Sequence, residues 1–393
     1  MMAEPPPDAV AALASALPSA EFVAVDIEFT GLSNDGDQQP RMFDSVERRF
    51  LKAKSVAETF AVVQLGVCVF RRDDDDDDML SATPLSFPIR PGRGTFACQA
   101  SSIRFLAEQG RFDFNELFRS GLSSEAEGAE VIRLLSASGI PIVMHNALLD
   151  ICFLMATFRP EGIPSDMASF KEACREMFPI LYDSKLICSK NAILRRVVTS
   201  CWLEKLFHFV EDDERFAGHP TITRLGTVDD SRHHDAAYDA FMTGVVFARA
   251  RAFLANPSAT ADAAGGNDVK EEWIEEDVDW SASDVSLLAN RICLNRSVRH
   301  LNIGGQDLMT FRGVLEVSIN GDASVKCRTS NIVDAIRPMI APDRVRVLWD
   351  DERSAFAIIG PQHDSLLDTI AAKVNRSPGL LFRVQPYRGS RRS

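Results

Sequence analysis

The stretch VAVDIEFTGL, residues 23–32, sets two carboxylates into an otherwise apolar segment. Its valine, isoleucine and phenylalanine residues predict a buried strand, and the two-residue period of a strand puts Asp26 and Glu28 on one face, roughly 7 Å apart. A buried carboxylate without a compensating charge costs several kcal/mol. We therefore expect either cations that neutralise the pair or a strand end that opens into a cleft.

The composition is that of a globular chain long enough for two domains. Of its 393 residues, 46% are hydrophobic and 25% are charged, which are ordinary proportions for a soluble protein. The net charge of −13 argues mildly against a general nucleic-acid coat, although the six aspartates at 73–78 supply nearly half of it. The eight cysteines contain no CxxC pair and have no histidines at zinc-finger spacing, so structural zinc is not expected.

The start of the chain and its hydropathy bear on its location. Residues 1–22 have no basic segment followed by an apolar core, and they lack the arginines of a transit peptide. The sequence contains no apolar run of about eighteen residues, so a membrane span is not expected. We expect a protein of the nucleus, the cytoplasm or both.

Alternating strand and helix patterns predict an α/β fold with a mixed sheet. Beyond the first strand, strands are expected at residues 59–71, 80–89 and 180–188, helices within 101–121, 129–137 and 239–254, and a strand running into a helix over 140–158. The aspartates at 73–78 fall between two of these strands. We expect them in a solvated hairpin loop, because a calcium loop would need varied ligands and a glycine.

A change of composition in the second half indicates a domain boundary. Residues 1–254 are predicted to form the first domain, and residues 255–285, rich in small and acidic side chains, to form a linker. Residues 286–310 return to an apolar pattern and are expected to pack back on the first domain. Residues 311–388 then predict a βαββαβ order, which small α+β RNA-recognition modules share with many other domains.

Two more acidic motifs lie where helices are expected to begin. In HNALLD, Asn146 and Asp150 are four residues apart and share one helical face. In HHDAAYDAF, Asp239 opens a long helix, Asp235 is the expected N-cap and His234 precedes it. Both motifs therefore bring acids to the ends of elements that neighbour the first strand.

Together with the first strand, these motifs supply four carboxylates and a histidine. Such a set suits two magnesium ions roughly 4 Å apart during cleavage of a phosphodiester, because the ions lower the pKa of the attacking water and stabilise charge on the phosphorus. The histidine is the candidate general base for that water, since its ordinary pKa lies near physiological pH. The predicted catalytic residues are Asp26, Glu28, Asp150, His234 and Asp239.

The order DxE, NxxxD, HxxxxD resembles the histidine-bearing subclass of the DEDD exonuclease superfamily. The segments DIEFTGL, CQASSIRFLAEQGRFDFNELFRSG, HNALLDICF, FPILYDSKL and HHDAAYDAF are similar to those of its poly(A)-specific ribonuclease (PARN) branch. The similarity runs through residues 22–248 and resumes near Asn290. The resemblance implies an RNase H-like DEDD nuclease fold for residues 1–254 and a homodimer formed through this domain.

The resemblance also implies roles for individual residues. The four carboxylates match acids that bind two Mg²⁺ ions, and His234 matches the general base, whereas His233 fits the spacing less well. Asp183 in the DSK triplet is interpreted as a structural acid. Trp349 resembles the tryptophan that PARN relatives stack on the mRNA cap, with core packing as an equal alternative. Contacts with the 3′-terminal nucleotides are implied for Phe29, Leu32 and Lys185.

The chain departs from this family at two places. Between Gly121 and Ile142, where vertebrate-type relatives carry a helical nucleic-acid-binding insert, only a short segment is present. In the C-terminal module, the strand positions that usually stack bases carry Leu315 and Ala357, with only Phe356 near an aromatic platform. Sequence-specific stacking of bases is therefore not expected there.

The leading hypothesis is a magnesium-dependent 3′-to-5′ exoribonuclease that removes poly(A) or oligo(A) from RNA 3′ ends and releases 5′-AMP, as the resemblance implies. One alternative is an enzyme that trims the 3′ ends of small RNAs with the same site. Another is an RNA- or cap-binding regulator with little nuclease turnover, which the intact set of acids argues against. RNA binding without turnover in magnesium would distinguish this last alternative from both enzymes.

Overall fold

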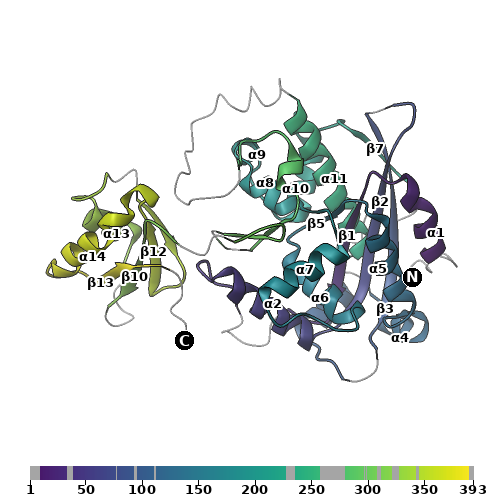
Figure 1. The fold of residues 1–393 in the computed structure, drawn as a ribbon, viewed down its shortest axis with the longest axis horizontal. Helices are drawn as coiled ribbons and strands as arrows, with labels where there is room; N and C mark the ends of the chain where they lie inside the picture. The colour runs from purple at the N-terminus through teal and green to yellow at the C-terminus, as the bar shows by residue number, and fades with distance from the viewer. Residues whose placement is uncertain are drawn as a thin grey trace.

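The computed structural model describes most of the chain (Figure 1). The described residues are 9–32, 39–76, 78–92, 95–109, 112–226, 235–256, 279–295, 297, 299–307, 311–320, 327–341 and 345–388. Most of the predicted linker lies outside them, as do His233 and His234. Within the described part, every helix is too short or too polar to span a lipid bilayer.

A seven-stranded mixed sheet forms the centre of the N-terminal part, which confirms the predicted α/β class. Its strands are β1 (Phe22–Phe29), β2 (Val62–Arg72), β3 (Met79–Arg90), β4 (Leu122–Ser123), β5 (Ile142–Met144), β6 (Leu181–Asp183) and β7 (Thr221–Arg224). The strand order is β4-β3-β2-β1-β5-β6, and β7 pairs with β3. β1 runs antiparallel to β2 and parallel to β5. The strand of the first acidic motif therefore lies inside the sheet.

Helices cover both faces of this sheet (Figure 1). The helices on one face are α1 (Ala9–Ala16), α2 (Val46–Thr59), α5 (Glu127–Ser138), α6 (Leu148–Phe158) and α7 (Met167–Met177). Those on the other are α8 (Ser184–Lys190), α9 (Leu194–Val197), α10 (Leu203–Asp212) and α11 (Ala236–Ala255). A smaller cluster packs α3 (Ala100–Glu108) and α4 (Phe114–Ser120) against Val63 on β2.

Strand β1 alternates between the two cores. The side chains that join the core of α1, α2, α5, α6 and α7 are Val23, Val25 and Ile27. Phe22 and Ala24 join the core under α11 instead. Because residues two apart share a face of a strand, Asp26 and Glu28 continue the α11 face. The period of the sequence thus decides which helix the two carboxylates meet.

The predicted elements agree with the structure except near residue 184. The aspartate run lies in the exposed turn between β2 and β3, as expected, with Asp77 outside the described residues. The strand expected over residues 180–188 is wrong beyond Asp183, where helix α8 begins. The Asp183 carboxylate accepts a hydrogen bond from the Leu186 N–H at 3.1 Å, and this N-cap starts the helix.

The segment after the linker packs on the N-terminal part. It forms a hairpin of β8 (Arg291–Cys293) and β9 (His300–Asn302), and Ile292 and Leu301 enter the α6-side core. The Lys171 ammonium pairs with the Asp307 carboxylate, N···O 2.7 Å, where both side chains are nearly buried. The hairpin is therefore part of the same folded body, while the boundaries of the four predicted parts stay a prediction.

A separate four-stranded antiparallel sheet forms the C-terminal part. Its elements are β10 (Val314–Ile319), α13 (Thr329–Ile336), β11 (Arg346–Trp349), β12 (Ser354–Ile358), α14 (Leu367–Arg376) and β13 (Phe382–Pro386), in the strand order β11-β12-β10-β13. Leu315 and Ala357 pack in the core with residues of the two helices. The interpretation of these two positions as base-stacking positions is wrong, because their side chains face the helices.

The opposite face of this small sheet contacts the N-terminal part. Phe356 stacks on Phe43 with ring centroids 3.8 Å apart, and the Tyr387 hydroxyl donates to the Phe43 carbonyl at 2.7 Å. Val314 and Ile358 complete the apolar cluster. Phe356, the aromatic residue that the sequence offered for base stacking in this module, is thus covered by the chain's own Phe43.

Gly66 sets how closely β2 and α11 approach. A Cβ atom at residue 66 would overlap the carbonyl group of Ala236, the first residue of α11. We expect Gly66→Ala to lower the free energy of unfolding by about 2 kcal/mol or more, because backbone has to shift. Gly304→Ala is the matched control, since the nearest atoms to its Cβ would lie at 3.6 and 3.7 Å. Equal unfolding midpoints of the two variants in urea would contradict this reading.

Candidate active site

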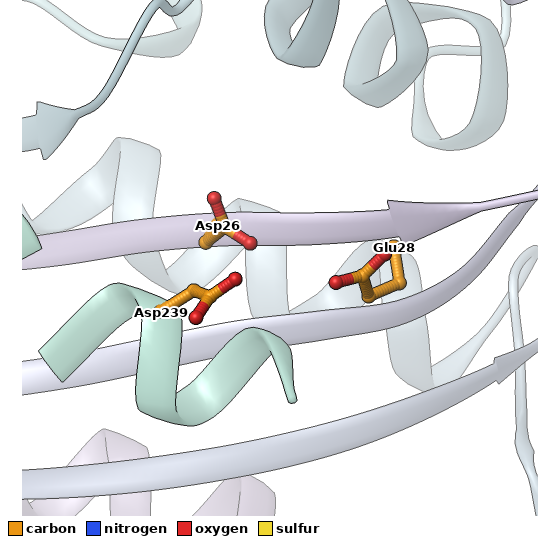
Figure 2. Close-up of side chains that lie close together, drawn as sticks. All are labelled: Asp26, Glu28 and Asp239. Carbon is orange, nitrogen blue, oxygen red and sulfur yellow. The ribbon is translucent and has the colours of Figure 1, made fainter. Parts of the chain in front are cut away.

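Three carboxylates from two elements meet where β1 contacts α11 (Figure 2). Asp26 and Glu28 lie on β1, and Asp239 lies in the first turn of α11. One carboxylate oxygen from each residue lies within 4.8 Å of those from the other two. All three side chains are partly exposed, so a cation can reach them from solvent. The structure thus brings together three of the acids that the motifs singled out.

Strand β2 fixes the start of α11. Asp235 caps the helix by accepting a hydrogen bond from a first-turn N–H at 3.0 Å, as the sequence predicts. The Gln64 side chain accepts from the Ala236 N–H and donates to the Asp235 carboxylate, both at 3.3 Å. It also donates to the Ser86 hydroxyl at 2.8 Å. Gln64, which no sequence motif marks, therefore determines where Asp239 projects.

Asp150 approaches the cluster from the next strand. It lies in the first turn of α6, which follows β5, the parallel neighbour of β1. Its negative charge is among the causes that raise the pKa of Asp26, after burial and the charge of Asp239. Asp150 therefore lies within electrostatic range of the cluster, although it is outside the group of three whose oxygens approach within 4.8 Å.

Burial and mutual repulsion raise the pKa values of these acids. For Asp26 and Glu28 the pKa lies well above the ordinary range, chiefly because of burial and next because of the charge of Asp239. Burial, followed by the charge of Asp183, raises the pKa of Asp150 in the same direction. Ionised carboxylates this close need positive charge nearby, and carboxylate oxygens are the ligands that Mg²⁺ prefers. The residues present therefore fit divalent cations.

Asp183 ties together three segments around the site. Its buried carboxylate accepts four backbone N–H groups, those of Asn146 at 3.0 Å, Ala147 at 3.1 Å, Leu186 at 3.1 Å and Cys293 at 2.9 Å. These donors belong to the turn before α6, to α8 and to β8. The turn needs this support because Asn146 has φ 69°, in the left-handed region. The interpretation of Asp183 as a structural acid agrees with these bonds.

His145 is hydrogen-bonded at both ring nitrogens. Its Nε2 donates to the Cys201 carbonyl at 3.1 Å, and its Nδ1 lies 2.9 Å from the Ser184 hydroxyl. Burial lowers its pKa to about 4, so the ring is neutral at physiological pH. These contacts occupy both ring nitrogens and give His145 a structural role in the turn before α6.

The residues predicted to contact the 3′ end of a substrate lie in different surroundings. Phe29, next to Glu28, stacks on Phe153 with ring centroids 4.5 Å apart. Leu32 is 54% exposed. The Lys185 ammonium donates to the Asn295 side chain at 3.3 Å, which joins α8 to the segment after β8. Nothing in these contacts assigns the three residues a ligand, so their roles stay predictions.

Two further predicted residues lie away from the cluster or outside the description. Trp349 is half-buried at the end of β11, and its indole N–H donates to the Thr329 hydroxyl at 3.0 Å. It packs against the C-terminal core rather than near β1. His234 lies outside the described residues, directly before the helix cap Asp235 in the sequence.

A mixed sheet that gathers carboxylates at one helix contact is the arrangement expected of an enzyme that binds divalent cations. The family profile described as CAF1 family ribonuclease matches residues 7–130 and 123–247, together more than half of the chain. The chain therefore belongs to the CAF1 ribonuclease family. The four predicted acids all fall within the matched residues.

Several curated proteins are similar to part of the chain. The poly(A)-specific ribonuclease PARN of Arabidopsis thaliana is 36% identical over 136 residues, which cover 31% of this chain and 19% of that protein. PARN of Homo sapiens is 38% identical over 116 residues, covering 27% and 18%. The poly(A)-specific ribonuclease PNLDC1 of Mus musculus is 32% identical over 110 residues, covering 26% and 20%. The chain thus spans about a fifth of the length of these relatives.

Two solved structures are similar at lower identity. The structure of S. pombe Pop2p in its Mg²⁺- and Mn²⁺-bound form matches 62% of this chain and 89% of its own, with 16% identity and a TM-score of 0.46. The RNase domain of the yeast Pop2 protein matches 63% and 89%, with 14% identity and a TM-score of 0.43.

Removing the acceptor at residue 183 should loosen the site. In Asp183→Asn an amide NH₂ replaces one oxygen and faces backbone donors, and each orphaned buried N–H costs about 1–3 kcal/mol. Each oxygen accepts two of these N–H groups, so we expect the free energy of unfolding in urea to fall by about 2–6 kcal/mol. The control is Asp166→Asn, at the exposed N-cap of α7, where asparagine caps equally well. If Asp183→Asn unfolds at the same urea concentration as this control, the proposed tie is wrong.

Neutralising one acid of the cluster should stabilise the metal-free protein. A raised pKa means that the folded chain holds its proton to higher pH than the unfolded chain, so stability falls as the pH rises above about 4. Asp26→Asn cannot ionise at residue 26, so it removes part of this loss of stability at neutral pH. We expect it to raise the metal-free melting temperature at neutral pH by about 2–4 °C and to reduce the further rise caused by Mg²⁺.

The measurement is thermal unfolding from about pH 5 to about pH 8, with MgCl₂ and with chelator. Asp75→Asn, in the exposed turn between β2 and β3, is the control because it changes the net charge equally without touching the cluster. A magnesium-induced rise of the same size in wild type and Asp26→Asn would show that Asp26 holds no cation.

Proposed function

We propose that the chain is a magnesium-dependent 3′-to-5′ exoribonuclease of the DEDD type, which removes poly(A) or oligo(A) from RNA 3′ ends and releases 5′-AMP. The observation that carries the proposal is the approach of the Asp26, Glu28 and Asp239 carboxylates to within 4.8 Å in a chain of the CAF1 ribonuclease family. Such a cluster opposes folding unless cations bind to it. A catalytic role explains why the chain carries a cluster that opposes its folding.

The acids and a histidine divide the chemistry between them. Two Mg²⁺ ions, if held there, would lower the pKa of the attacking water and stabilise the charge on the phosphate. The proposed general base is His234, which directly precedes the cap of the helix that carries Asp239. His145 does not compete for this role, because both of its nitrogens are engaged. The proposed ligands are Asp26, Glu28, Asp150 and Asp239.

Side chains beside the acids are proposed to position the 3′-terminal nucleotide. Phe29 is held by its stack on Phe153, and Leu32 is 54% exposed at the end of the same segment. Lys185 supplies a cation for a phosphate from the first turn of α8. Preference for adenine is supported by the names of the similar proteins, since stacking alone does not exclude guanine.

Two alternative functions, cap binding, the homodimer and the cellular location stay predictions. An enzyme that trims the 3′ ends of small RNAs would use the same site on a different RNA. An RNA- or cap-binding regulator with little turnover would leave the carboxylate cluster unexplained. Cap binding by Trp349 has no support beyond the resemblance, because this side chain packs on the C-terminal core and bonds Thr329. The homodimer and the nuclear or cytoplasmic location likewise stay predictions.

A time course on 5′-labelled RNA with an oligo(A) tail tests the proposal, with oligo(U) RNA and DNA as matched substrates. We expect shortening from the 3′ end that needs Mg²⁺, stops in chelator and prefers adenine. Asp239→Asn should lower kcat by about a hundredfold or more, because it removes a proposed ligand. Asp166→Asn should retain wild-type kcat. Binding of the RNA without shortening in Mg²⁺ would overturn the nuclease and favour the binding protein.

A further inference from the structure

Trp202 is the most exposed large apolar side chain in the described part of the chain, with 76% of its surface exposed. An apolar side chain stabilises a fold through the area that it buries, so this indole adds little to folding. Trp202 is the residue directly before α10, and its carbonyl accepts from the Leu206 N–H at 2.8 Å. The indole is therefore presented to solvent from a fixed point of the backbone.

The backbone beside Trp202 is bonded to the edge of the sheet that carries the acids. The Cys201 carbonyl accepts the hydrogen bond from His145 Nε2 at 3.1 Å. His145 directly follows β5 and precedes Asn146, in the turn that leads into α6 and Asp150. One hydrogen bond and one peptide unit thus separate Trp202 from the turn that positions Asp150. This path points to a place for the indole at the rim of the candidate active site.

Positive side chains gather around the same point. Burial raises the pKa of the Cys201 thiol, and the charges of Lys185 and Arg195 oppose that rise, so both cations lie within electrostatic range. Arg196, beside Arg195 on α9, and Lys205, in the first turn of α10, are exposed, and so is Glu204 of the same turn, which offsets one of these charges. In a chain with a net charge of −13, such a local excess of cations favours contact with a polyanion.

We propose that these residues form a platform for single-stranded RNA upstream of the nucleotide that is removed. A base stacks on the exposed indole and the cations contact neighbouring phosphates, which is how proteins hold single strands without reading their sequence. Tryptophan and arginine are also enriched at protein interfaces, so a protein partner is an outcome of the test, whereas the hydrogen-bonded path from Cys201 to the turn before Asp150 favours RNA. This inference rests on the proposed function, whose substrate it extends. The Trp202 platform consists of Trp202, Arg195, Arg196 and Lys205, and Lys185 keeps its proposed place at the 3′-terminal nucleotide.

Because the platform lies at the rim, its contribution should depend on the length of the RNA. A short oligo(A) reaches the acids and the residues beside them but does not reach Trp202. A longer RNA gains the stacked base and its phosphate contacts. Truncating the indole should therefore weaken the binding of long RNAs selectively, whereas a general loss of fold would weaken the binding of RNAs of every length.

Fluorescence anisotropy with 5′-labelled oligo(A) RNAs of increasing length tests the proposal. All variants carry Asp26→Asn, which removes turnover. Trp202→Ala should raise the Kd of long RNAs about 5- to 150-fold and leave that of tri-adenylate unchanged. Trp202→Phe, which keeps a stacking ring, should recover most of the affinity. The control is Phe118→Ala, 52% exposed on α4 beside β3, toward the other edge of the sheet.

The outcomes separate this proposal from the proposed function. In the catalytically intact chain, Trp202→Ala should raise KM for long oligo(A) and leave kcat unchanged. An unchanged Kd at every RNA length in Trp202→Ala overturns the platform. An equal rise of the Kd for long RNAs in Phe118→Ala also overturns it. If Trp202→Ala abolishes binding to a protein partner while the Kd for RNA is unchanged, the surface binds protein and the RNA platform is wrong. If long RNA binds through Trp202 but is never shortened in Mg²⁺, the platform is supported and only the nuclease is overturned.

Discussion

Repulsion between carboxylates is the constraint on which the N-terminal part depends. Asp26, Glu28 and Asp239 approach within 4.8 Å, and the charges of Asp239 and Asp150 add to burial in raising the pKa values of Asp26 and Glu28. The packing of the sheet opposes this repulsion: Phe22, on the same face of β1, stacks on Phe70 with ring centroids 4.6 Å apart and meets an α11 ring edge-on. The contacts that build the core therefore also force the acids together, and bound divalent cations, which these acids fit, would relieve the remaining repulsion.

The surroundings of a buried acid distinguish a structural role from a ligand role. Asp183 receives four backbone N–H groups, which satisfy its charge without a cation and join α6, α8 and β8. Asp26 instead lies within electrostatic range of four other acids, Asp239, Asp150, Glu28 and Asp235. The tie through Asp183 also makes the segment after the linker part of the scaffold that holds Asp150. Figure 1 shows this segment lying between the N-terminal body and the small C-terminal sheet.

Pattern reasoning failed where a segment is apolar on both faces. In the C-terminal sheet, Ala357 packs under the helices and Phe356 packs on Phe43, so alternation could not tell which face is covered by which layer. Residues 180–188 are apolar at both ends around the polar Asp183, Ser184 and Lys185, and there a side-chain cap from Asp183 starts a helix in place of the predicted strand. The first error depends on packing between distant layers, whereas the second overlooked a capping signal that the sequence carries locally.

The sequence by itself determined the α/β class, the central strands and the acids of the site, because strand alternation, helix spacing and capping act over a few residues. Only the tertiary structure decided which distant groups hold those acids in place. Gln64 reaches the start of α11 across 172 positions of the chain, and Asp183 reaches Cys293 across 110. It also decided that Trp202 stays exposed, next to the residue whose carbonyl bonds His145. Such contacts depend on how whole elements pack, and packing between residues this far apart leaves no periodic signal in either segment.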